Sequence, residues 1–197
     1  MIEFKLNNQT VQAQEGESLL KVAQRHGVDI PHLCHKDGLR ADGNCRACVV
    51  EIKGERTLAP SCCRTATAGL EVLVSERAVK SQKMVLEMLL SDMPDAGHKW
   101  NDQGQHGELS DWASRMAVRV RPALQALRRE QPACDVSHPA MAVNLDACIQ
   151  CNRCVRACRE EQVNDVIGYA NRGAHSQIVF DLNDEMGNST CVACGEC

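Results

Sequence analysis

Cys148-Ile149-Gln150-Cys151-Asn152-Arg153-Cys154-Val155-Arg156-Ala157-Cys158 is the stretch from which the fold of this chain is best inferred, and Cys191-Val192-Ala193-Cys194-Gly195-Glu196-Cys197 follows it. The first run has the spacing C-x2-C-x2-C-x3-C, in which short loops wrap three thiolates round one face of a cubane [4Fe-4S] cluster. The second run repeats that spacing as far as its third cysteine. A structural zinc site usually draws four ligands from two separated pairs, so this density of thiolates favours iron–sulfur clusters, with zinc as the alternative.

The ligands of the two clusters follow from the pattern of two-cluster ferredoxins, in which the fourth cysteine of each run binds the other cluster. The second [4Fe-4S] cluster is therefore expected to take Cys158, Cys191, Cys194 and Cys197. The first [4Fe-4S] cluster keeps three cysteines of this chain, Cys148, Cys151 and Cys154. We expect the fourth ligand to lie beyond Cys197, in a longer polypeptide of which this sequence is a fragment. The alternative is a three-cysteine site with an open iron.

The N-terminal third predicts a small α+β unit of β-grasp character. Residues 2–6 and 10–13 alternate apolar and polar side chains around the turn signal Asn7-Asn8, which predicts a β-hairpin. Ser18 is placed to cap a helix that Gly27 would end. Further strands are expected at residues 48–53 and 70–74.

Four cysteines in this third have the spacing C-x10-C-x2-C-x13-C: Cys34, Cys45, Cys48 and Cys62. Plant-type [2Fe-2S] domains have C-x4-C-x2-C and a distant fourth cysteine, so this chain keeps that plan with a longer first loop. Gly38 and Gly43 allow that loop to curl closely round a cluster. The pattern predicts a [2Fe-2S] cluster, and two pairs of cysteines leave a zinc site as the alternative.

Composition sets limits on the class of protein. Only 3% of the 197 residues are aromatic, so metal binding is expected to supply part of the folding free energy. Thirteen cysteines also suit a disulfide scaffold, but no apolar leader follows Met1, so we expect reduced thiols and a cytoplasmic location. No apolar run reaches the ~18 residues of a membrane span. A net charge of −4 gives no reason to expect nucleic acid as a partner.

The middle of the chain predicts helices. Residues 76–90 carry apolar side chains at helical spacing after Ser75, and we expect Met84 and Met88 to pack in the core. Residues 92–107 are expected to be a linker, residues 109–118 a helix, and Pro122 a break. The resulting domains are 1–75 ([2Fe-2S] ferredoxin-type), 76–138 (helical linker) and 139–197 (two-cluster [4Fe-4S] ferredoxin-like, incomplete at its C-terminus). In the last of these, residues 143–145 predict a strand, 152–162 a helix, and 166–169 with 177–180 a hairpin.

Three further segments carry a resemblance to a known family: Leu58-Ala59-Pro60-Ser61-Cys62-Cys63-Arg64, Cys148-Ile149-Gln150-Cys151 and Glu161-Gln162-Val163-Asn164-Asp165-Val166-Ile167-Gly168. With the cysteine runs, they resemble the N-terminal iron–sulfur region of the alpha subunit of soluble NAD-dependent molybdenum or tungsten formate dehydrogenases. Relatives of that family are the large peripheral subunit of respiratory complex I and NAD-linked hydrogenases. The resemblance covers the whole chain.

The resemblance implies an iron–sulfur electron relay. Electrons from formate, oxidised at a molybdopterin centre in a part of the subunit absent from this sequence, would pass to a flavin- and NAD-binding partner, beside small iron–sulfur subunits. It also implies that Cys62 is the ligand, and Cys63 is then expected to be a small buried residue. Many relatives have another [4Fe-4S] site in the middle region, but residues 64–133 contain no cysteine, so His98 and His106 are expected at the surface. Cys134 is expected to be a bystander, with a substitute ligand as the alternative.

No phosphate-binding loop or catalytic triad is present in the sequence, so no catalytic centre is expected in this chain. One alternative is a stand-alone multicluster ferredoxin or hydrogenase-type diaphorase subunit, which natural termination near Cys197 would favour. Another is a zinc-stabilised interaction module. The middle region contains five arginines: Arg115, Arg119, Arg121, Arg128 and Arg129. We expect them to form a solvated face, and the alternative is a docking face for an acidic partner.

Overall fold

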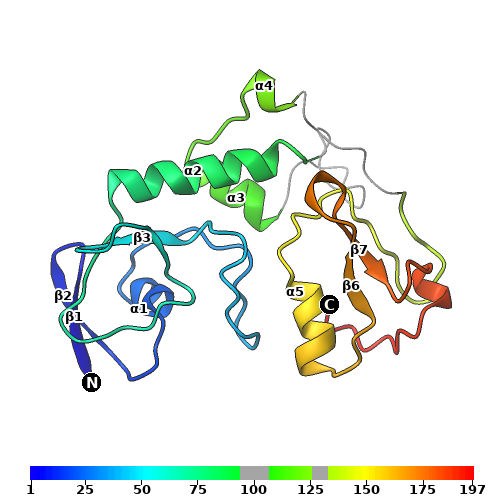
Figure 1. Ribbon diagram of the computed structural model, residues 1–197, viewed down its shortest axis with the longest axis horizontal. Helices are drawn as coiled ribbons and strands as arrows, with labels where there is room; N and C mark the ends of the chain where they lie inside the picture. The colour runs from blue at the N-terminus through cyan, green and yellow to red at the C-terminus, as the bar shows by residue number, and fades with distance from the viewer. Residues whose placement is uncertain (94–106, 126–132) are drawn as a thin grey trace. The chain divides into compact units, whose positions relative to one another are not determined.

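The computed structural model describes residues 1–93, 107–125 and 133–197 (Figure 1). Contacts divide the chain into two units that are not continuous in sequence. The first comprises Met1–His35, Ala41–Met88 and Trp112–Arg119, and the second comprises Lys36–Arg40, Leu89–Asp111 and Val120–Cys197. Most of the helix that we assigned to a linker therefore lies in the first unit. The domain boundaries at residues 75 and 138 stay predictions.

The first unit is built on a mixed five-stranded sheet with the order β2-β1-β5-β3-β4. Its strands are β1 (Ile2–Leu6), β2 (Gln9–Ala13), β3 (Val49–Ile52), β4 (Ala59–Pro60) and β5 (Glu71–Leu73). Strands β1 and β5 run parallel, and the other neighbours are antiparallel. Asn7 and Asn8 both have positive φ, as a two-residue hairpin turn requires, so the predicted hairpin is confirmed.

Helix α1 (Leu19–Arg25) supplies the other half of this core. It begins where the Ser18 hydroxyl accepts a hydrogen bond from the Lys21 amide at 3.3 Å, and Gly27 follows it with a φ of 69°. Four side chains of α1 are buried with the inward residues of the sheet: Leu19, Leu20, Val22 and Ala23. Phe4 is the one aromatic side chain in this buried cluster, so the core of the described first unit is mostly aliphatic.

Helix α2 (Glu76–Leu90) confirms the predicted middle helix. The Ser75 hydroxyl accepts a hydrogen bond from the Ala78 amide at 3.2 Å. Ala78, Gln82 and Leu86 recur every four residues and are buried, so they define the inner face. Met84 and Met88 lie on other faces and are 48% and 62% exposed, so our prediction that they pack in the core is wrong.

Two shorter helices follow, α3 (Glu108–Arg115) and α4 (Pro122–Gln125). The first confirms the helix expected at 109–118 but ends earlier, and Ala117 has a positive φ of 52° just after it. Pro122 begins α4 rather than breaking the chain, because proline suits the first position of a helix. The predicted linker at 92–107 lies largely outside the described residues.

The second unit contains a hairpin and a short helix. The hairpin joins β6 (Ile167–Ala170) to β7 (Gln177–Phe180), with Ile167 opposite Phe180. The helix begins as α5 (Arg153–Arg156) and continues as a π-helix, η1 (Ala157–Glu161). The unit also contains two 3-10 turns, η2 (Gly173–His175) and η3 (Met186–Asn188), and helix α4. The predicted helix and hairpin are confirmed.

The strand predicted at residues 143–145 is wrong, since Val143 forms only an isolated bridge with Asp135. The Asn144 side chain accepts a hydrogen bond from the Asp146 amide at 3.0 Å, a local bond that competes with strand pairing. The core of the second unit is small, and it packs against cysteines that belong to the clustered motifs: Cys148, Cys154 and Cys191. Among the helices that the structure describes, none combines the length and the apolar character needed to cross a membrane.

Candidate metal centres

Three segments of the first unit carry its four predicted ligands. Cys34 follows the buried Leu33, Cys48 directly precedes strand β3, and Cys62 lies two positions after β4. Cys45 and Cys48 flank a short turn in which Arg46 has a φ of 59°. Cys45 is half-buried and the other three cysteines are buried.

The four sulfur atoms form one connected set. The Cys34 thiol hydrogen-bonds with the thiols of both Cys45 and Cys62, and the Cys62 thiol also bonds with Cys48. The main chain contributes donors as well, because the amides of Asn44 and Cys45 bond to the Cys34 sulfur. The structure therefore brings together the four cysteines that the sequence predicts for this site.

Proton affinities in this set are strongly uneven. Hydrogen bonds from the thiols of Cys45 and Cys62 lower the pKa of Cys34 to about 2. The Cys62 thiol likewise lowers the pKa of Cys48 to about 7. The hydrogen bonds to Cys34 raise the pKa values of the two donors, Cys45 and Cys62. Since the thiolate is the form that binds metal, the site is arranged to carry negative charge that a metal cluster would neutralise.

Cys63 differs from our prediction, because its side chain is exposed rather than buried. Its sulfur lies 3.5 Å from the Cys62 sulfur. Gly43 packs beside it, and a Cβ atom at Gly43 would come within 2.9 Å of the Cys63 sulfur. Of the adjacent pair, Cys62 is the one whose thiol bonds with Cys34 and Cys48.

His32 precedes Cys34 by two positions and has structural contacts. Its Nδ1 lies 2.9 Å from the Ile30 carbonyl oxygen, and its Nε2 lies 3.4 Å from the Gln24 amide nitrogen. The ring packs edge-on against Trp112, with centroids 5.7 Å apart. Trp112 in turn lies under the Arg115 guanidinium, which pairs with Asp29. Arg115 is thus engaged within the first unit, while Arg128, Arg129, His98 and His106 lie outside the described residues.

The first run of the second unit curls its cysteines together. Gln150 and Asn152, on either side of Cys151, both have positive φ, so the chain turns sharply at that ligand. Burial raises the pKa of Cys154 to about 12, and the nearby sulfurs of Cys151 and Cys148 add to the shift. The sulfur atoms of this run therefore lie close enough to interact electrostatically.

The sulfur atoms of the C-terminal run also lie close together, and the Cys158 sulfur lies near them. Burial raises the pKa of Cys197, and negative charge at Cys191, Cys194 and Cys158 contributes. Cys158 is 7% exposed, and its sulfur accepts a hydrogen bond from the Val166 amide at 3.4 Å. Cys197 also contributes to the raised pKa of Cys154, so sulfurs of the two runs lie near each other, and the assignment of Cys158 to the C-terminal set stays a prediction. Cys134 is half-buried and lies outside both runs.

The donor chemistry fits iron–sulfur clusters. Among the described residues, no three His, Cys, Asp or Glu side chains are placed to share a single metal ion. A cluster of several irons distributes its thiolates over different metal atoms, so such convergence on one ion is not required. All the candidate ligands are cysteines, which is the donor set that [2Fe-2S] and [4Fe-4S] clusters use.

One residue of functional interest was missed by the sequence reasoning. Arg156 lies between Cys154 and Cys158 and is only 2% exposed. Its neighbours Val155 and Ala157 are also buried, so the whole turn faces inward. Nothing in the cysteine spacing indicated a buried cation here. An apolar residue on each side of a single arginine was the one available signal.

Comparison with known proteins assigns the first part of the chain. Residues 1–77 match the 2Fe-2S iron-sulfur cluster binding domain family. Those residues therefore form a 2Fe-2S cluster-binding domain, and they include all four cysteines of the first site.

The chain as a whole is similar to subunits of NAD-linked and quinone-linked oxidoreductases. It is 30% identical to the NADP-reducing hydrogenase subunit HndD of Solidesulfovibrio fructosivorans, over 100% of this chain and 34% of that protein. It is also 30% identical to an NADH-quinone oxidoreductase subunit of Rhizobium meliloti, over 100% of this chain and 23% of that protein. The chain thus spans about a third or less of these relatives.

A solved structure shares the fold. The crystal structure of an NAD+-reducing [NiFe]-hydrogenase in the H2-reduced state superposes with a TM-score of 0.81 and 26% sequence identity. The match covers 98% of this chain and 80% of that chain. The similarity therefore extends well beyond the 2Fe-2S domain.

Proposed function

We propose that this chain is an iron–sulfur electron relay, the electron-transfer portion of a larger NAD-linked oxidoreductase. The observation that carries the proposal is the connected set of four sulfurs inside the 2Fe-2S domain. We assign the [2Fe-2S] cluster to that set: Cys34, Cys45, Cys48 and Cys62. Iron–sulfur clusters accept and donate single electrons, and their potentials depend on hydrogen bonds to sulfur and on burial.

We further propose two [4Fe-4S] clusters in the second unit. The first is assigned to Cys148, Cys151 and Cys154, with a fourth ligand from a continuation of the chain. The second is assigned to Cys158, Cys191, Cys194 and Cys197. Cys154 interacts with Cys148 and Cys151, and Cys197 interacts with Cys191, Cys194 and Cys158, which suits this division. Cys154 also interacts with Cys197, so the division itself rests on the spacing of two-cluster ferredoxins.

The protein's own contribution at each site is to hold thiolates and shield them. Amides of Asn44 and Cys45 donate to the Cys34 sulfur, and the Val166 amide donates to the Cys158 sulfur. Such N–H···S bonds stabilise negative charge on sulfur and favour the reduced cluster. Burial of Cys34, Cys48 and Cys62 limits access of water to the first site.

For the partners, we propose a flavin- and NAD-binding subunit with small iron–sulfur subunits. The names of the relatives, which are subunits of NADP-reducing hydrogenase and NADH-quinone oxidoreductase, support a multi-subunit setting. The sequence around the ligands favours formate as the electron source, oxidised at a molybdopterin domain of the same subunit. No disulfide joins any of the thirteen cysteines, which suits a reducing compartment, and we propose the cytoplasm.

A hydrogenase-type electron-transfer subunit is the second candidate. The similarity to HndD and to the NAD+-reducing hydrogenase structure favours it. The two candidates differ in the electron donor, so the native complex should be supplied with formate or with hydrogen under anaerobic conditions. Bleaching of cluster absorbance by formate alone supports the formate dehydrogenase reading, and bleaching by hydrogen alone supports the alternative.

A cysteine substitution tests the [2Fe-2S] assignment. In Cys48→Ser protein, we expect the [2Fe-2S] EPR signal to be lost or strongly altered while the [4Fe-4S] signals stay. Cys134→Ser is the matched control and should keep every signal. An unchanged [2Fe-2S] signal in Cys48→Ser would show that the assignment is wrong, and a colourless zinc protein would favour the interaction module.

A further inference from the structure

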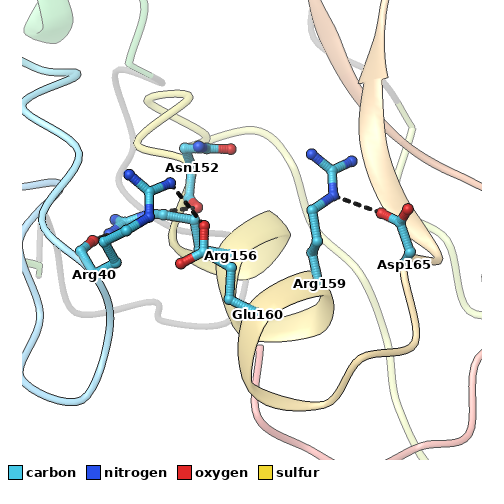
Figure 2. A network of polar contacts seen from close by, with 6 residues as sticks. All are labelled: Arg40, Asn152, Arg156, Arg159, Glu160 and Asp165. Carbon is cyan, nitrogen blue, oxygen red and sulfur yellow. Dashed lines mark hydrogen bonds and ion pairs between the residues drawn. The ribbon is translucent and has the colours of Figure 1, made fainter.

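Arg156 is a buried cation within the cysteine run 148–158. It is 2% exposed and lies two positions from both Cys154 and Cys158. Arginine is rarely buried unless its N–H groups have partners. Its Nε donates to the Asn152 carbonyl at 3.2 Å, and its Nη1 donates to the Arg40 carbonyl (Figure 2). Both partners are main-chain oxygens, so the side chain binds backbone rather than another charge at these two atoms.

The first of these bonds fixes the cysteine loop itself. Asn152 lies between Cys151 and Cys154 and has a left-handed φ of 67°. Its carbonyl also accepts the main-chain N–H of Arg156 at 3.1 Å. Arg156 therefore holds the turn that precedes helix α5 through two hydrogen bonds to one carbonyl, one from its side chain and one from its main chain.

The second bond reaches a different segment of the chain. Arg40 belongs to residues 36–40, which lie in sequence between Cys34 and Cys45 and which by their contacts are part of the second unit. Glu160, one helical turn after Arg156, pairs with the Arg40 guanidinium at 2.8 Å. The main chain and the side chain of Arg40 are thus both bound by the α5–η1 helix, as Figure 2 shows.

The Arg40–Glu160 ion pair and the Arg156 hydrogen bonds differ in how much they stabilise this contact. The Arg40 and Glu160 side chains are 65% and 27% exposed, and exposed ion pairs contribute little. The Arg156 side chain is buried and its bonds are charge-assisted, so losing them should cost more than losing the exposed pair. Arg159 on the same helix pairs instead with Asp165 at 2.7 Å, a local contact that does not involve residues 36–40 (Figure 2).

We propose that Arg156 is a positioning residue that anchors residues 36–40 to the cysteine run 148–158 within the second unit. This inference rests on the proposed function, since the two motifs are taken to hold the clusters between which electrons pass. Within the second unit, Arg156 keeps residues 36–40 in one conformation against the helix that carries Cys154 and Cys158. Its removal should therefore slow electron passage without removing any ligand.

Hydrogen exchange of the complete, cluster-loaded chain tests the anchor. In Arg156→Met, amide exchange of residues 36–44 should rise about tenfold over wild type, because a buried charge-assisted hydrogen bond is lost. Arg156→Lys keeps one charged donor and should give a smaller rise. Arg159→Met is the matched control and should exchange as wild type does. Equal exchange in Arg156→Met and wild type, or an equal rise in Arg159→Met, would overturn the inference.

A second variant covers the case in which Arg156→Met fails to fold. Glu160→Gln removes the charge that pairs with Arg40 and leaves the buried bonds in place. It should raise exchange of residues 36–44 about twofold at low salt, and this difference should disappear at about 1 M salt, where exposed pairs are screened. No rise at low salt, together with an Arg156→Lys protein that exchanges as wild type does, would overturn the role of this helix in holding the segment.

Freeze-quench EPR provides the functional readout. After rapid reduction of the second unit's clusters, the [2Fe-2S] signal should appear more slowly in Arg156→Met than in Arg159→Met, at equal iron and sulfide content. An unchanged rate would overturn the positioning role in electron passage. Zinc in place of iron in the wild-type protein would refute the proposed function instead, and the exchange result would still report on the anchor.

Discussion

The Gln82 side-chain amide of helix α2 donates a 2.8 Å hydrogen bond to the main-chain carbonyl of Val49, the residue that follows Cys48. Gln82 is 1% exposed, so this bond lies in the interior of the first unit. It ties the helix to the start of strand β3, where a predicted ligand is placed. Helix α2 is thus part of the support for the [2Fe-2S] site.

Replacing Gln82 should loosen that support. In Gln82→Ala, the Val49 carbonyl loses its buried donor, which should lower the free energy of unfolding by about 1–3 kcal/mol. Lys83→Ala, on the exposed neighbouring position, should change it by less than about 0.5 kcal/mol. Urea unfolding followed by far-UV circular dichroism measures both. Equal stability of the two variants would contradict this role for Gln82.

The adjacent cysteines should respond differently to substitution. Cys62→Ser removes a thiol that bonds with Cys34 and Cys48, so the [2Fe-2S] absorbance and EPR signal should be lost or shifted. Cys63 is exposed, so Cys63→Ser should retain the cluster at wild-type iron content. The opposite result, with the signal lost only in Cys63→Ser, would transfer the ligand role to Cys63.

Gly187 is packed too closely to accept a side chain. A Cβ atom there would come 2.5 Å from the Ser137 carbonyl oxygen, so Gly187→Ala must displace main chain and should cost about 1–3 kcal/mol of stability. Gly168→Ala is the matched control, because no atom lies within 4 Å of its Cβ position. Thermal unfolding of the two variants checks the difference. A Gly187→Ala protein as stable as the control would refute the close approach.

Metal removal should affect the two units unequally. Among the described residues, the buried cluster of the first unit contains sixteen residues, whereas that of the second contains seven and packs against three cysteines of the motifs. Without clusters, amides of residues 148–197 should exchange at rates near those of an unfolded chain, and those of strands β1 and β2 should stay protected. Hydrogen exchange before and after anaerobic chelation measures this. Equal loss of protection in both units would contradict it.

Local sequence signals predicted much of the fold. Asn7-Asn8, Ser18 and Gly27 each specify a backbone conformation directly, so the hairpin and helix α1 could be placed from sequence. The cysteine spacing likewise indicated which sulfurs gather, because short loops restrict where a thiol can point. These features depend on neighbours within a few residues.

Features that depend on tertiary contacts were missed. Cys63 is exposed although its sulfur lies close to Gly43, and the exposure of Met84 follows from the face of α2 that Gln82 turns toward Val49. Burial of Arg156 requires the Arg40 carbonyl, which lies 116 residues away in sequence. No local pattern encodes such a pairing.

Mössbauer spectroscopy of the full-length native protein, purified without oxygen, is the sharpest test of the cluster assignments. We expect one [2Fe-2S] and two [4Fe-4S] clusters from this region, which amounts to about ten iron and ten sulfide per chain. Where further domains add iron to the spectrum, the Cys48→Ser variant identifies the share of this region. It should reduce the [2Fe-2S] component and leave the [4Fe-4S] components. Stoichiometric zinc with no iron–sulfur spectrum from this region would refute the electron relay.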